Sequence, residues 1–569
     1  MKSRYRPKIS LEGVWRFKLD PDDKGEVEGW YNGLDTTEVI YVPSSWNEQN
    51  PLWDNYMGVA WYETEFFVPE IFREKIPWII FEGAGYKAKV WLNGVYLGEH
   101  ECSFTSFKFN IRNTIKFNEV NKLVVRIDNK LTPKNIPPGE AMNKTYFDFF
   151  HYGGIFRPVY IEFTEESYIE DITVITDHKG TLKVNVVING VGKFNVNLHL
   201  LDSKGNVMFS TTRKSIEKEV LIEEEIEGVK PWSPQEPNLY TLKVDLLGKN
   251  GILDSVEEQI GFRSIKIENG KLLLNDKPVF LKGIGRHEDY PITGKFLPGA
   301  VLVRDFYLMK ELKANAFRTT HYPYSRLHLD LADRFGFMVI LEAPLVGLRD
   351  IHFIDEEYLN KAKKIIKEMI KEHKNRPSVI AYSIANEPFS YIEEARSFLK
   401  ALYDHVKSLD PTRPITFASA LNLADKAIDV VDIISVNLYL GWYSYPGDLD
   451  TGLEIAEKIL DKLHELYPTK PIMVTEFGAG AISGLHSDPP LMWSEEYQAE
   501  FIKRYIERLH GKKYLVGMHI WGFADFRTPQ SSRRTILNRK GLFTRTRQPK
   551  LAARIVKEEF SKIPTFLEN

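Results

Sequence analysis

Residues 314–344 read ANAFRTTHYPYSRLHLDLADRFGFMVILEAP, and this stretch decides the fold class. Two short apolar runs, ANAFRT and GFMVILEAP, stand on either side of SRLHLDLADRF, whose apolar residues recur at helical spacing. A strand, a helix and a second strand in this order predict a βαβ unit of a parallel sheet. The segment that follows, NKAKKIIKEMIKEHK, has the pattern of another helix with one apolar face.

The same alternation extends in both directions from this stretch. The other candidate strands are KPVFLKGIG (277–285), SVIAYSIANEP (378–388), PITFASA (414–420), VDIISVNLY (431–439), PIMVTEFG (471–478) and YLVGMHIWGF (514–523). With the two runs above they make eight strands, the number in a (β/α)8 barrel. We therefore predict such a barrel over residues 266–569.

The preceding residues have the composition of β-sandwich domains. Residues 1–165 contain short runs rich in β-branched and aromatic residues, such as YETEFFVP and NKLVVRIDN, separated by Gly, Asn and Pro turns. This pattern predicts a jelly-roll sandwich. Residues 166–265 repeat it with IEDITVITD, TLKVNVVING and YTLKVDLLG, at the turn spacing of a small immunoglobulin-like sandwich.

Composition excludes several classes of function. The 569 residues include 75 Lys and Arg against 78 Asp and Glu, so no net positive charge favours nucleic acid or an anionic membrane. No apolar run is long enough to span a bilayer, and no signal peptide is visible, which favours a cytoplasmic protein. Cys102 is the only cysteine, and the His residues are scattered without metal-ligand spacing. We predict no cofactor and no metal.

Candidate catalytic residues follow two of the predicted strands. Asn386 and Glu387 end the fourth strand, and Glu476 ends the seventh. In a (β/α)8 barrel the C-terminal strand ends form the active site. Two carboxylates facing each other across such a site are what glycoside hydrolysis requires, because one protonates the leaving oxygen and the other attacks the anomeric carbon. Either Glu taken alone is as consistent with a helix cap or a salt bridge, so the prediction depends on the pair.

Longer motifs carry a resemblance to a known family. They include LEGVWRF, VPSSWNEQ, AKVWLNGVYLGEH, FHYGGIFRPV, GFRSIKI, KGIGRHEDYP, NAFRTTHYPYS, ANEP and TEFG. Together they resemble glycoside hydrolase family 2 over essentially the whole chain. The resemblance implies a jelly-roll sugar-binding domain, an immunoglobulin-like domain and a catalytic barrel, with Glu387 as acid/base and Glu476 as nucleophile of a retaining mechanism.

Within this family the sequence is most similar to the β-glucuronidases, because the end of the barrel reads ILNRKGLFTRTRQPK. The resemblance makes Asn538 and Lys540 the pair that binds the C6 carboxylate of glucuronic acid, with Arg534 as a further cationic contact. A charge-assisted bond to a carboxylate suits an ammonium in a partly dehydrated pocket. Without the resemblance, the run of Arg and Lys in this segment would be interpreted as a basic surface loop.

Further residues match positions that contact substrate in the family. Asn386 resembles the residue that binds the sugar 2-hydroxyl, and Tyr439 the phenol that orients the nucleophile. His321 and Asp148 match contacts to the sugar hydroxyls, with Asp148 reaching in from the first domain. Two more, Tyr443 and Trp521, match pocket aromatics, although an aromatic residue at such a place is as often a packing residue.

The sequence also departs from the family pattern. Leu438 and Leu440 stand where many members have Arg and Tyr, and Gly480 stands where Asp is usual. The segment between Leu345 and Asp355 is short, which predicts an open leaving-group site.

The function predicted is that of an exo-acting, retaining β-glucuronidase that takes a small-molecule or oligosaccharide glucuronide and assembles as a homo-oligomer, a dimer or tetramer as is common in the family. The alternatives are a family-2 β-galactosidase or β-galacturonidase, which would share both carboxylates, and a carbohydrate-binding protein with an inactive barrel. Only the contacts to C4 and C6 distinguish the enzymes.

Overall fold

A closed parallel barrel forms the C-terminal half of the computed structural model, which describes residues 1–215, 218–249 and 251–567. All eight predicted strands are confirmed. They are β23 (Leu281–Arg286), β24 (Ala316–Thr319), β25 (Met338–Glu342), β26 (Val379–Asn386), β27 (Ile415–Ser419), β28 (Ile434–Asn437), β29 (Ile472–Phe477) and β30 (Leu515–Trp521). The barrel closes because β23 pairs in parallel with both β24 and β30.

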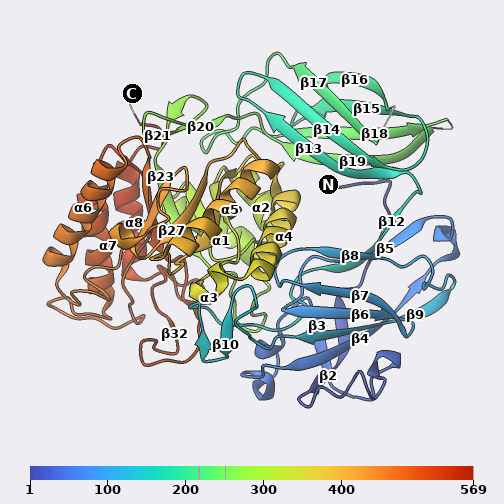
Figure 1. Ribbon diagram of the computed structural model, residues 1–569, viewed down its shortest axis with the longest axis horizontal. Helices are drawn as coiled ribbons and strands as arrows, with labels where there is room; N and C mark the ends of the chain where they lie inside the picture. The colour runs from blue at the N-terminus through green and yellow to red at the C-terminus, as the bar shows by residue number, and fades with distance from the viewer. Residues whose placement is uncertain (216–217, 250, 568–569) are drawn as a thin grey trace.

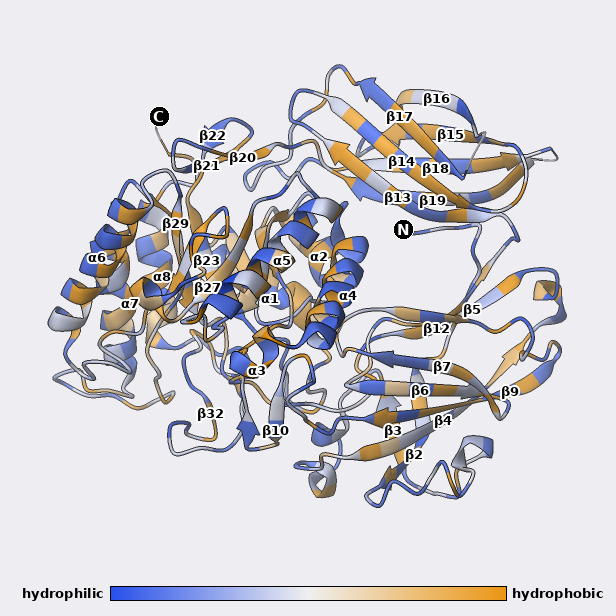
Figure 2. Ribbon diagram, viewed as in Figure 1, coloured by the Kyte–Doolittle hydropathy of each residue, from blue (hydrophilic) through white to orange (hydrophobic). Residues whose placement is uncertain are grey.

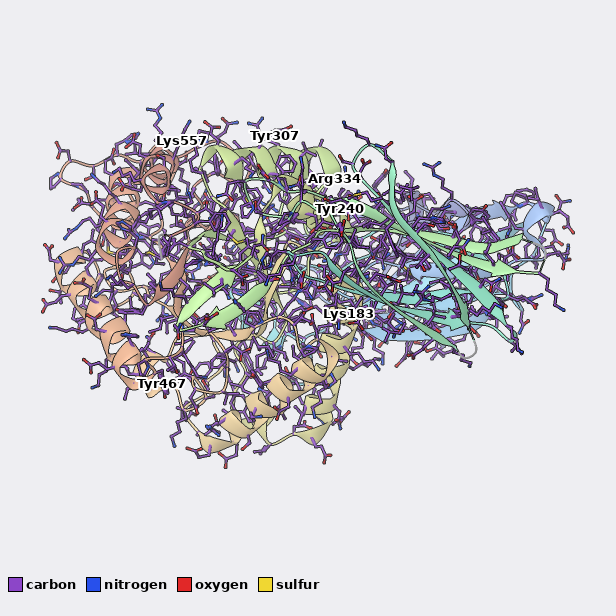
Figure 3. The ribbon with its side chains drawn as sticks, turned by 90° about the horizontal axis from the view of Figure 1, so that it is seen from above. Lys183, Tyr240, Tyr307, Arg334, Tyr467 and Lys557 are labelled. Atoms are coloured by element: carbon purple, nitrogen blue, oxygen red, sulfur yellow. The ribbon has the colours of Figure 1, made fainter. Side chains whose placement is uncertain are left out.

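Helices surround these strands. They are α1 (Gly299–Glu311), α2 (Arg326–Phe335), α3 (Asp350–Phe353), α4 (Glu356–His373), α5 (Glu393–Leu409), α6 (Leu449–Leu466), α7 (Glu495–Leu509) and α8 (Leu551–Lys562). In α4 the side chain of Asp355 accepts a hydrogen bond from the Tyr358 amide and so caps the N-terminus. Ile365, Ile366 and Met369 of α4 are buried, whereas Tyr307 of α1 is 63% exposed and, like Lys557 of α8, lies at the outer surface (Figure 3).

The first β domain is a sandwich of two antiparallel sheets with strand orders β1-β12-β5-β8 and β3-β2-β4-β9-β6-β7. Its strands are β1 (Lys8–Ser10), β2 (Gly13–Asp20), β3 (Val39–Val42), β4 (Val59–Val68), β5 (Ile76–Phe81), β6 (Lys87–Leu92), β7 (Val95–Glu101), β8 (Phe107–Asn110), β9 (Glu119–Asp128) and β12 (Val159–Thr164), with the hairpin β10 (Gly139–Ala141) and β11 (Lys144–Thr145). Alternate residues of β2, among them Trp15 and Phe17, are buried between the sheets, as the period of two requires.

The second β domain contains two smaller sheets, β13-β14-β17 and β16-β15-β18-β19. Its strands are β13 (Tyr168–Thr176), β14 (Thr181–Asn189), β15 (Phe194–Leu201), β16 (Val207–Ser215), β17 (Glu219–Glu225), β18 (Tyr240–Gly248) and β19 (Gly251–Ile260). Apolar and polar residues alternate along β14 and β18, and Figure 2 shows this as alternating orange and blue. Both predicted sandwiches are therefore confirmed.

Short elements complete the chain. They are η1 (Trp30–Asn32), η2 (Trp46–Glu48), η3 (Pro51–Trp53), η4 (Glu70–Phe72), η5 (Asn422–Ala424), β20 (Ile265–Glu268), β21 (Lys271–Leu274), β22 (Lys277–Pro278), β31 (Phe526–Arg527) and β32 (Leu537–Asn538). In Figure 1 the two β domains lie on the right and the barrel on the left, with β10 of the first domain extending to the barrel beside β32.

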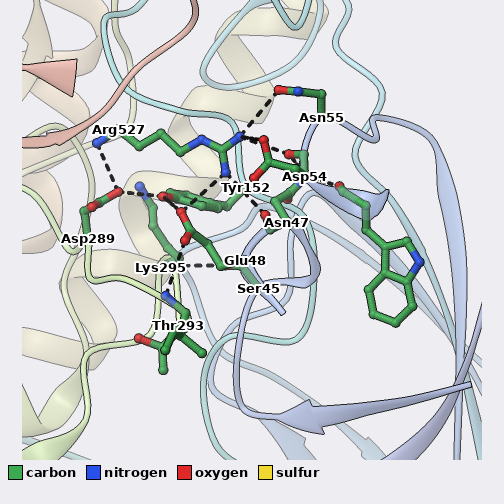
Figure 4. A network of polar contacts seen from close by, with 12 residues as sticks. Ser45, Asn47, Glu48, Asp54, Asn55, Tyr152, Asp289, Thr293, Lys295 and Arg527 are labelled. Atoms are coloured by element: carbon green, nitrogen blue, oxygen red, sulfur yellow. Dashed lines mark hydrogen bonds and ion pairs between the residues drawn. The ribbon is translucent and has the colours of Figure 1, made fainter. Parts of the chain in front are cut away.

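A network of ion pairs holds the first β domain against the barrel (Figure 4). Arg527 Nη2 lies 2.6 Å from Asp54 Oδ2, and Arg527 Nη1 lies 3.3 Å from Glu48 Oε1. The second cation on Glu48 is Arg545, whose Nη2 lies 2.7 Å from Oε1. The Tyr152 hydroxyl donates to Asp289 at 2.7 Å. Residues 528–544, which include the predicted carboxylate-binding residues, are therefore anchored at both ends to the first domain.

Candidate active site

The barrel strands open at their C-terminal ends into a cavity of about 620 Å³. All the predicted site residues except Asn538 line it: Asp148, His321, Asn386, Glu387, Tyr439, Tyr443, Glu476, Trp521, Arg534 and Lys540. Segments far apart in the sequence thus meet at one place, and Asp148 comes from the first β domain as expected.

Glu476, at the end of β29, is only 4% exposed. One carboxylate oxygen accepts a hydrogen bond from Arg318 Nη2, and the other accepts one from the Tyr439 hydroxyl at 2.6 Å. Burial raises the pKa of Glu476, while the Arg318 charge and the Tyr439 hydrogen bond oppose that rise. These two donors hold the carboxylate in a fixed orientation and stabilise its ionised form, the state that a nucleophile requires.

Glu387 follows β26 with φ at +46°, a conformation uncommon for a residue other than glycine. Its Oε1 accepts from Asn437 Nδ2 at 2.8 Å, and Asn437 is itself fixed by the Thr475 hydroxyl, which donates to its amide oxygen at 2.8 Å. Burial, with the neighbouring Glu476 charge as a second cause, raises the pKa of Glu387 to about 7. Glu387 is therefore protonated up to neutral pH, as a general acid must be.

One side of the cavity is formed by a buried group around Arg318. His321 Nδ1 lies 2.7 Å from Glu342 Oε1, and the imidazole stacks on Trp521 with ring centroids 5.2 Å apart. Burial holds the pKa of His321 well below its usual range, so the ring is neutral. The side-chain oxygen of Asn386 accepts from Arg318 Nη1 at 3.1 Å.

The other side carries the charged residues that the sequence assigned to a substrate carboxylate. The Arg534 guanidinium is held by the Asp148 carboxylate and donates to the Tyr443 hydroxyl at 2.8 Å. Asn538 Nδ2 also donates to Asp148, at 3.0 Å. Asn538 thus lies behind the cavity wall, where it orients Asp148.

Lys540 is a buried cation without a carboxylate partner among the described residues. It is 2% exposed, its Nζ donates to the Tyr443 hydroxyl, and it lies 4.3 and 4.7 Å from the ring centroids of Tyr443 and Tyr439. Burial lowers the pKa of Lys540. An ammonium in such surroundings favours an anionic ligand, because an unpaired buried charge is costly.

Three residues at this site were missed by the sequence reasoning. Arg318 lies in β24, Glu342 ends β25 and Asn437 ends β28. Each lies toward the C-terminal end of a barrel strand, and that position was the available signal. Arg318 donates to Glu476 and Asn437 donates to Glu387, so both belong to the site as much as Tyr439 does.

The departures from the family pattern are accommodated by packing. Leu438 is 1% exposed, lines the cavity with an apolar side chain, and donates its backbone amide to the Glu476 carbonyl at 2.8 Å. A Cβ on Gly480 would lie 2.9 Å from Trp493 and 3.0 Å from Trp442, so these indoles leave no room for an Asp.

Within the part of the chain that the structure describes, no cluster of His, Cys, Asp and Glu residues has the arrangement of a metal site. No described helix is long and apolar enough to cross a membrane. Cys102 is fully buried, and burial raises its pKa to about 11, which suits a packing residue.

Comparison with known proteins gives the same three-part division of the chain. Models of glycosyl hydrolases family 2 match residues 9–164 (sugar binding domain), 167–263 and 265–565 (TIM barrel domain). The chain is 36% identical to a β-glucuronidase of Sus scrofa, with 99% of this chain and 92% of the relative covered.

Solved structures are similar over the full length. A β-glucuronidase of Ruminococcus gnavus in complex with D-glucuronic acid has a TM-score of 0.93 at 35% identity and covers 98% of both chains. A β-D-glucuronidase of Dictyoglomus thermophilum has a TM-score of 0.92 at 37% identity, with 100% of this chain and 99% of that chain covered.

Proposed function

Because the chain belongs to glycosyl hydrolase family 2, we propose that it is an exo-acting, retaining β-glucuronidase that hydrolyses β-D-glucuronides to D-glucuronate and an alcohol. The observation that carries the substrate assignment is Lys540, a buried ammonium in the cavity without an ion-pair partner among the described residues. The C6 carboxylate of a glucuronide supplies the missing anion. A β-galactoside would leave Lys540 unpaired, and relatives over the full length are β-glucuronidases.

The reaction proceeds by double displacement. A carboxylate oxygen of Glu476 attacks the anomeric carbon as the bond to the leaving oxygen breaks, and the proton of Glu387 passes to that oxygen to give the alcohol. Glu387, now ionised, removes a proton from water, which attacks the same carbon and releases Glu476 with net retention. The two carboxyl groups of a retaining enzyme lie roughly 5 to 5.5 Å apart, and we expect that separation during turnover.

The remaining residues bind the sugar ring. Asn386 binds the 2-hydroxyl, and Tyr439 orients Glu476. His321 and Asp148 bind further hydroxyls, with Trp521 and Tyr443 as the aromatic walls. In this proposal Lys540 makes the principal contact to the C6 carboxylate, with Arg534 and Asn538 completing that end of the pocket.

Hydrolysis of nitrophenyl glucuronide and nitrophenyl galactoside by the wild type and by Lys540→Ala tests this assignment. We expect the wild type to prefer the glucuronide. Removing one member of a charge pair in a desolvated pocket costs ~2 to 5 kcal/mol, so glucuronide kcat/KM should fall by roughly two to three orders of magnitude or more. A wild type that prefers the galactoside, or equal losses on both substrates, would contradict the proposal.

We also propose domain boundaries at residues 165/166 and 265/266, a cytoplasmic location and a homo-oligomer. Limited proteolysis, cell fractionation and sedimentation check these three predictions in turn.

A further inference from the structure

The outer part of the cavity is built from residues for which the proposed mechanism has no role. Tyr146 follows β11 of the first domain, Arg349 lies in the loop after β25, and Phe389 lies in the loop after β26. Arg349 is exposed and Phe389 is 44% exposed, in contrast to the buried Glu476 and Lys540. These three residues therefore form the rim of the cavity.

The rim lies on the side of the general acid. The Gly347 amide donates to the Asn386 carbonyl at 2.9 Å, and the Phe389 amide donates to the Leu348 carbonyl at 2.8 Å. The loop that carries Arg349 is thus hydrogen-bonded to the chain on both sides of Glu387. Because the general acid protonates the leaving oxygen, the leaving group must lie on this side.

Arg349 offers the rim a positive charge in a fixed place. Its Cζ lies 3.6 Å from the Tyr146 ring centroid and 5.8 Å from that of Phe389. It has no ion pair with any described residue. The neighbouring carboxylates have other partners: Glu140 accepts from Tyr146 and Lys144, and Asp350 accepts from Tyr391. No side chain in the described part of the chain accepts from the guanidinium, although its charge lowers the pKa of Glu140, so its edges can donate to a ligand while the rings hold its plane.

Contacts between the two domains make this rim rigid. Gly347 has φ at +61°, and a Cβ there would lie 2.1 Å from the Tyr146 carbonyl oxygen, so the backbones are in close contact. His352 Nε2 lies 2.9 Å from the Pro133 carbonyl oxygen of the first domain. A site formed in advance loses little entropy on binding.

We propose that the rim is a leaving-group subsite that selects planar aromatic aglycones carrying an anionic substituent. The aromatic ring of the aglycone packs on Phe389, and its carboxylate or sulfate pairs with Arg349. This inference rests on the proposed function, because it concerns the aglycone of the same substrate.

The test compares kcat/KM for phenyl, 4-carboxyphenyl and methyl glucuronide in the wild type, Arg349→Gln, Arg349→Lys and Phe389→Leu. Intrinsic differences between leaving groups cancel when each variant is compared with the wild type. Arg349→Gln should lower the 4-carboxyphenyl value about 5- to 20-fold and the phenyl value less than about twofold. Arg349→Lys should retain part of the preference, and Phe389→Leu should affect both aryl substrates more than the methyl one.

Salt provides a second measurement that needs no variant. Raising NaCl from 50 to 500 mM, roughly a threefold shorter Debye length, should lower the wild-type preference for the carboxylated substrate. Arg112→Gln, which removes a half-exposed cation outside the cavity, is the matched control. It should change neither the ratio of the 4-carboxyphenyl to the phenyl kcat/KM nor the ratio of the aryl to the methyl values.

Equal losses on both aryl substrates in Arg349→Gln, or a preference insensitive to salt, would overturn the inference. A wild type that hydrolyses phenyl glucuronide but shows an unchanged ratio in Arg349→Gln contradicts the subsite alone. A wild type without activity on any glucuronide contradicts the proposed function itself.

Discussion

At the scale of single residues, Glu387 and Glu476, the proposed acid and nucleophile, differ in what surrounds them. Among the side chains that the structure describes, Arg318 and Tyr439 donate to Glu476, whereas Glu387 accepts from the neutral amide of Asn437. Burial acts on both groups, but among the described residues the Arg318 guanidinium hydrogen-bonds to Glu476 and acts on Glu387 through its charge without a hydrogen bond. The proton of the pair therefore resides on Glu387.

Replacing Glu387 by Gln should lower kcat/KM by a factor that depends on the leaving group of the substrate. General acid catalysis contributes about 10²- to 10⁴-fold, so kcat/KM for methyl glucuronide should fall by that factor. Nitrophenyl glucuronide needs little protonation and should lose far less. kcat/KM is the quantity to measure, because it excludes the later step in which Glu387 acts as base. Glu476→Gln should abolish turnover of both, and equal losses in Glu387→Gln would assign the acid elsewhere.

The pH profile provides an independent check. Because the pKa of Glu387 is raised to about 7, kcat/KM should decline above neutral pH as Glu387 loses its proton. At low pH kcat/KM should decline again, because Glu476 gains a proton. The two limbs belong to the coupled pair. Glu387→Gln should remove the alkaline limb measured with nitrophenyl glucuronide, and an unchanged limb would contradict the assignment.

The sequence predicted residue types better than their partners. Both carboxylates could be found because they follow apolar strands. The pairing of Arg534 with Asp148 spans 386 positions, and nothing in the local pattern indicates it. Arg547, which the alternative interpretation placed in a basic surface loop, is 2% exposed and paired with Asp305. Long-range ion pairs depend on the packing of domains, which residue patterns do not encode.

At the scale of elements, the regular spacing of apolar residues made the barrel strands predictable. The connecting segments have no such spacing and could not be predicted. The eight strands are apolar runs with turn residues between them. The one-turn helix α3 and the two-residue strands β31 and β32 are too short to show a period. Arg349 of the rim directly precedes α3, and Asn538 lies in β32, so the local pattern indicated neither residue and Asn538 was predicted only through the resemblance.

The loop after β29 illustrates how packing of an element constrains one position. Restoring the usual family residue with Gly480→Asp should destabilise this protein, because the new Cβ would meet Trp493 and Trp442 at 2.9 and 3.0 Å. Overpacking of this kind costs ~1 to 3 kcal/mol, and a buried carboxylate adds to it. Gly511→Asp is the matched control, since a Cβ there meets nothing within 4 Å.

Thermal unfolding of the wild type, Gly480→Asp and Gly511→Asp measures the loss of stability. Gly480→Asp should melt at a lower temperature than Gly511→Asp. It should also raise KM for nitrophenyl glucuronide, because Trp442 lies 5.8 Å from Lys540 Nζ. Equal melting temperatures for the two variants would show that the indoles move aside.

At the scale of the whole molecule, the first β domain helps to build the catalytic pocket. It supplies Asp148 to the carboxylate end and Tyr146 to the rim. The network in Figure 4 fixes its position through Glu48 and Arg527. Arg545, at the other end of the loop that carries Lys540, also pairs with Glu48. Glu48 does not line the cavity, but we expect the specificity for the substrate to depend on its carboxylate.

Glu48→Gln should weaken both stability and substrate binding. Breaking a buried pair by removing one partner costs ~3 to 5 kcal/mol, and Glu48 is 11% exposed with its Oε1 also 3.0 Å from the Tyr152 hydroxyl. The variant should raise KM for nitrophenyl glucuronide more than it lowers kcat, because the two catalytic carboxylates keep their contacts. Glu166→Gln breaks a pair whose carboxylate is 74% exposed, and this control should change neither quantity measurably.

The pH dependence of this effect has a definite sign. Burial alone would raise the pKa of Glu48, but Arg545, Arg527 and Tyr152 hold it below its usual range. A carboxylate with a lowered folded-state pKa stabilises the fold above its unfolded pKa of about 4.3 and loses that contribution as pH falls through the folded value. The difference in melting temperature between the wild type and Glu48→Gln should therefore be full at pH 7 and shrink below roughly pH 4. A difference that stays constant as the pH falls would show that the charge of Glu48 is not what stabilises the fold.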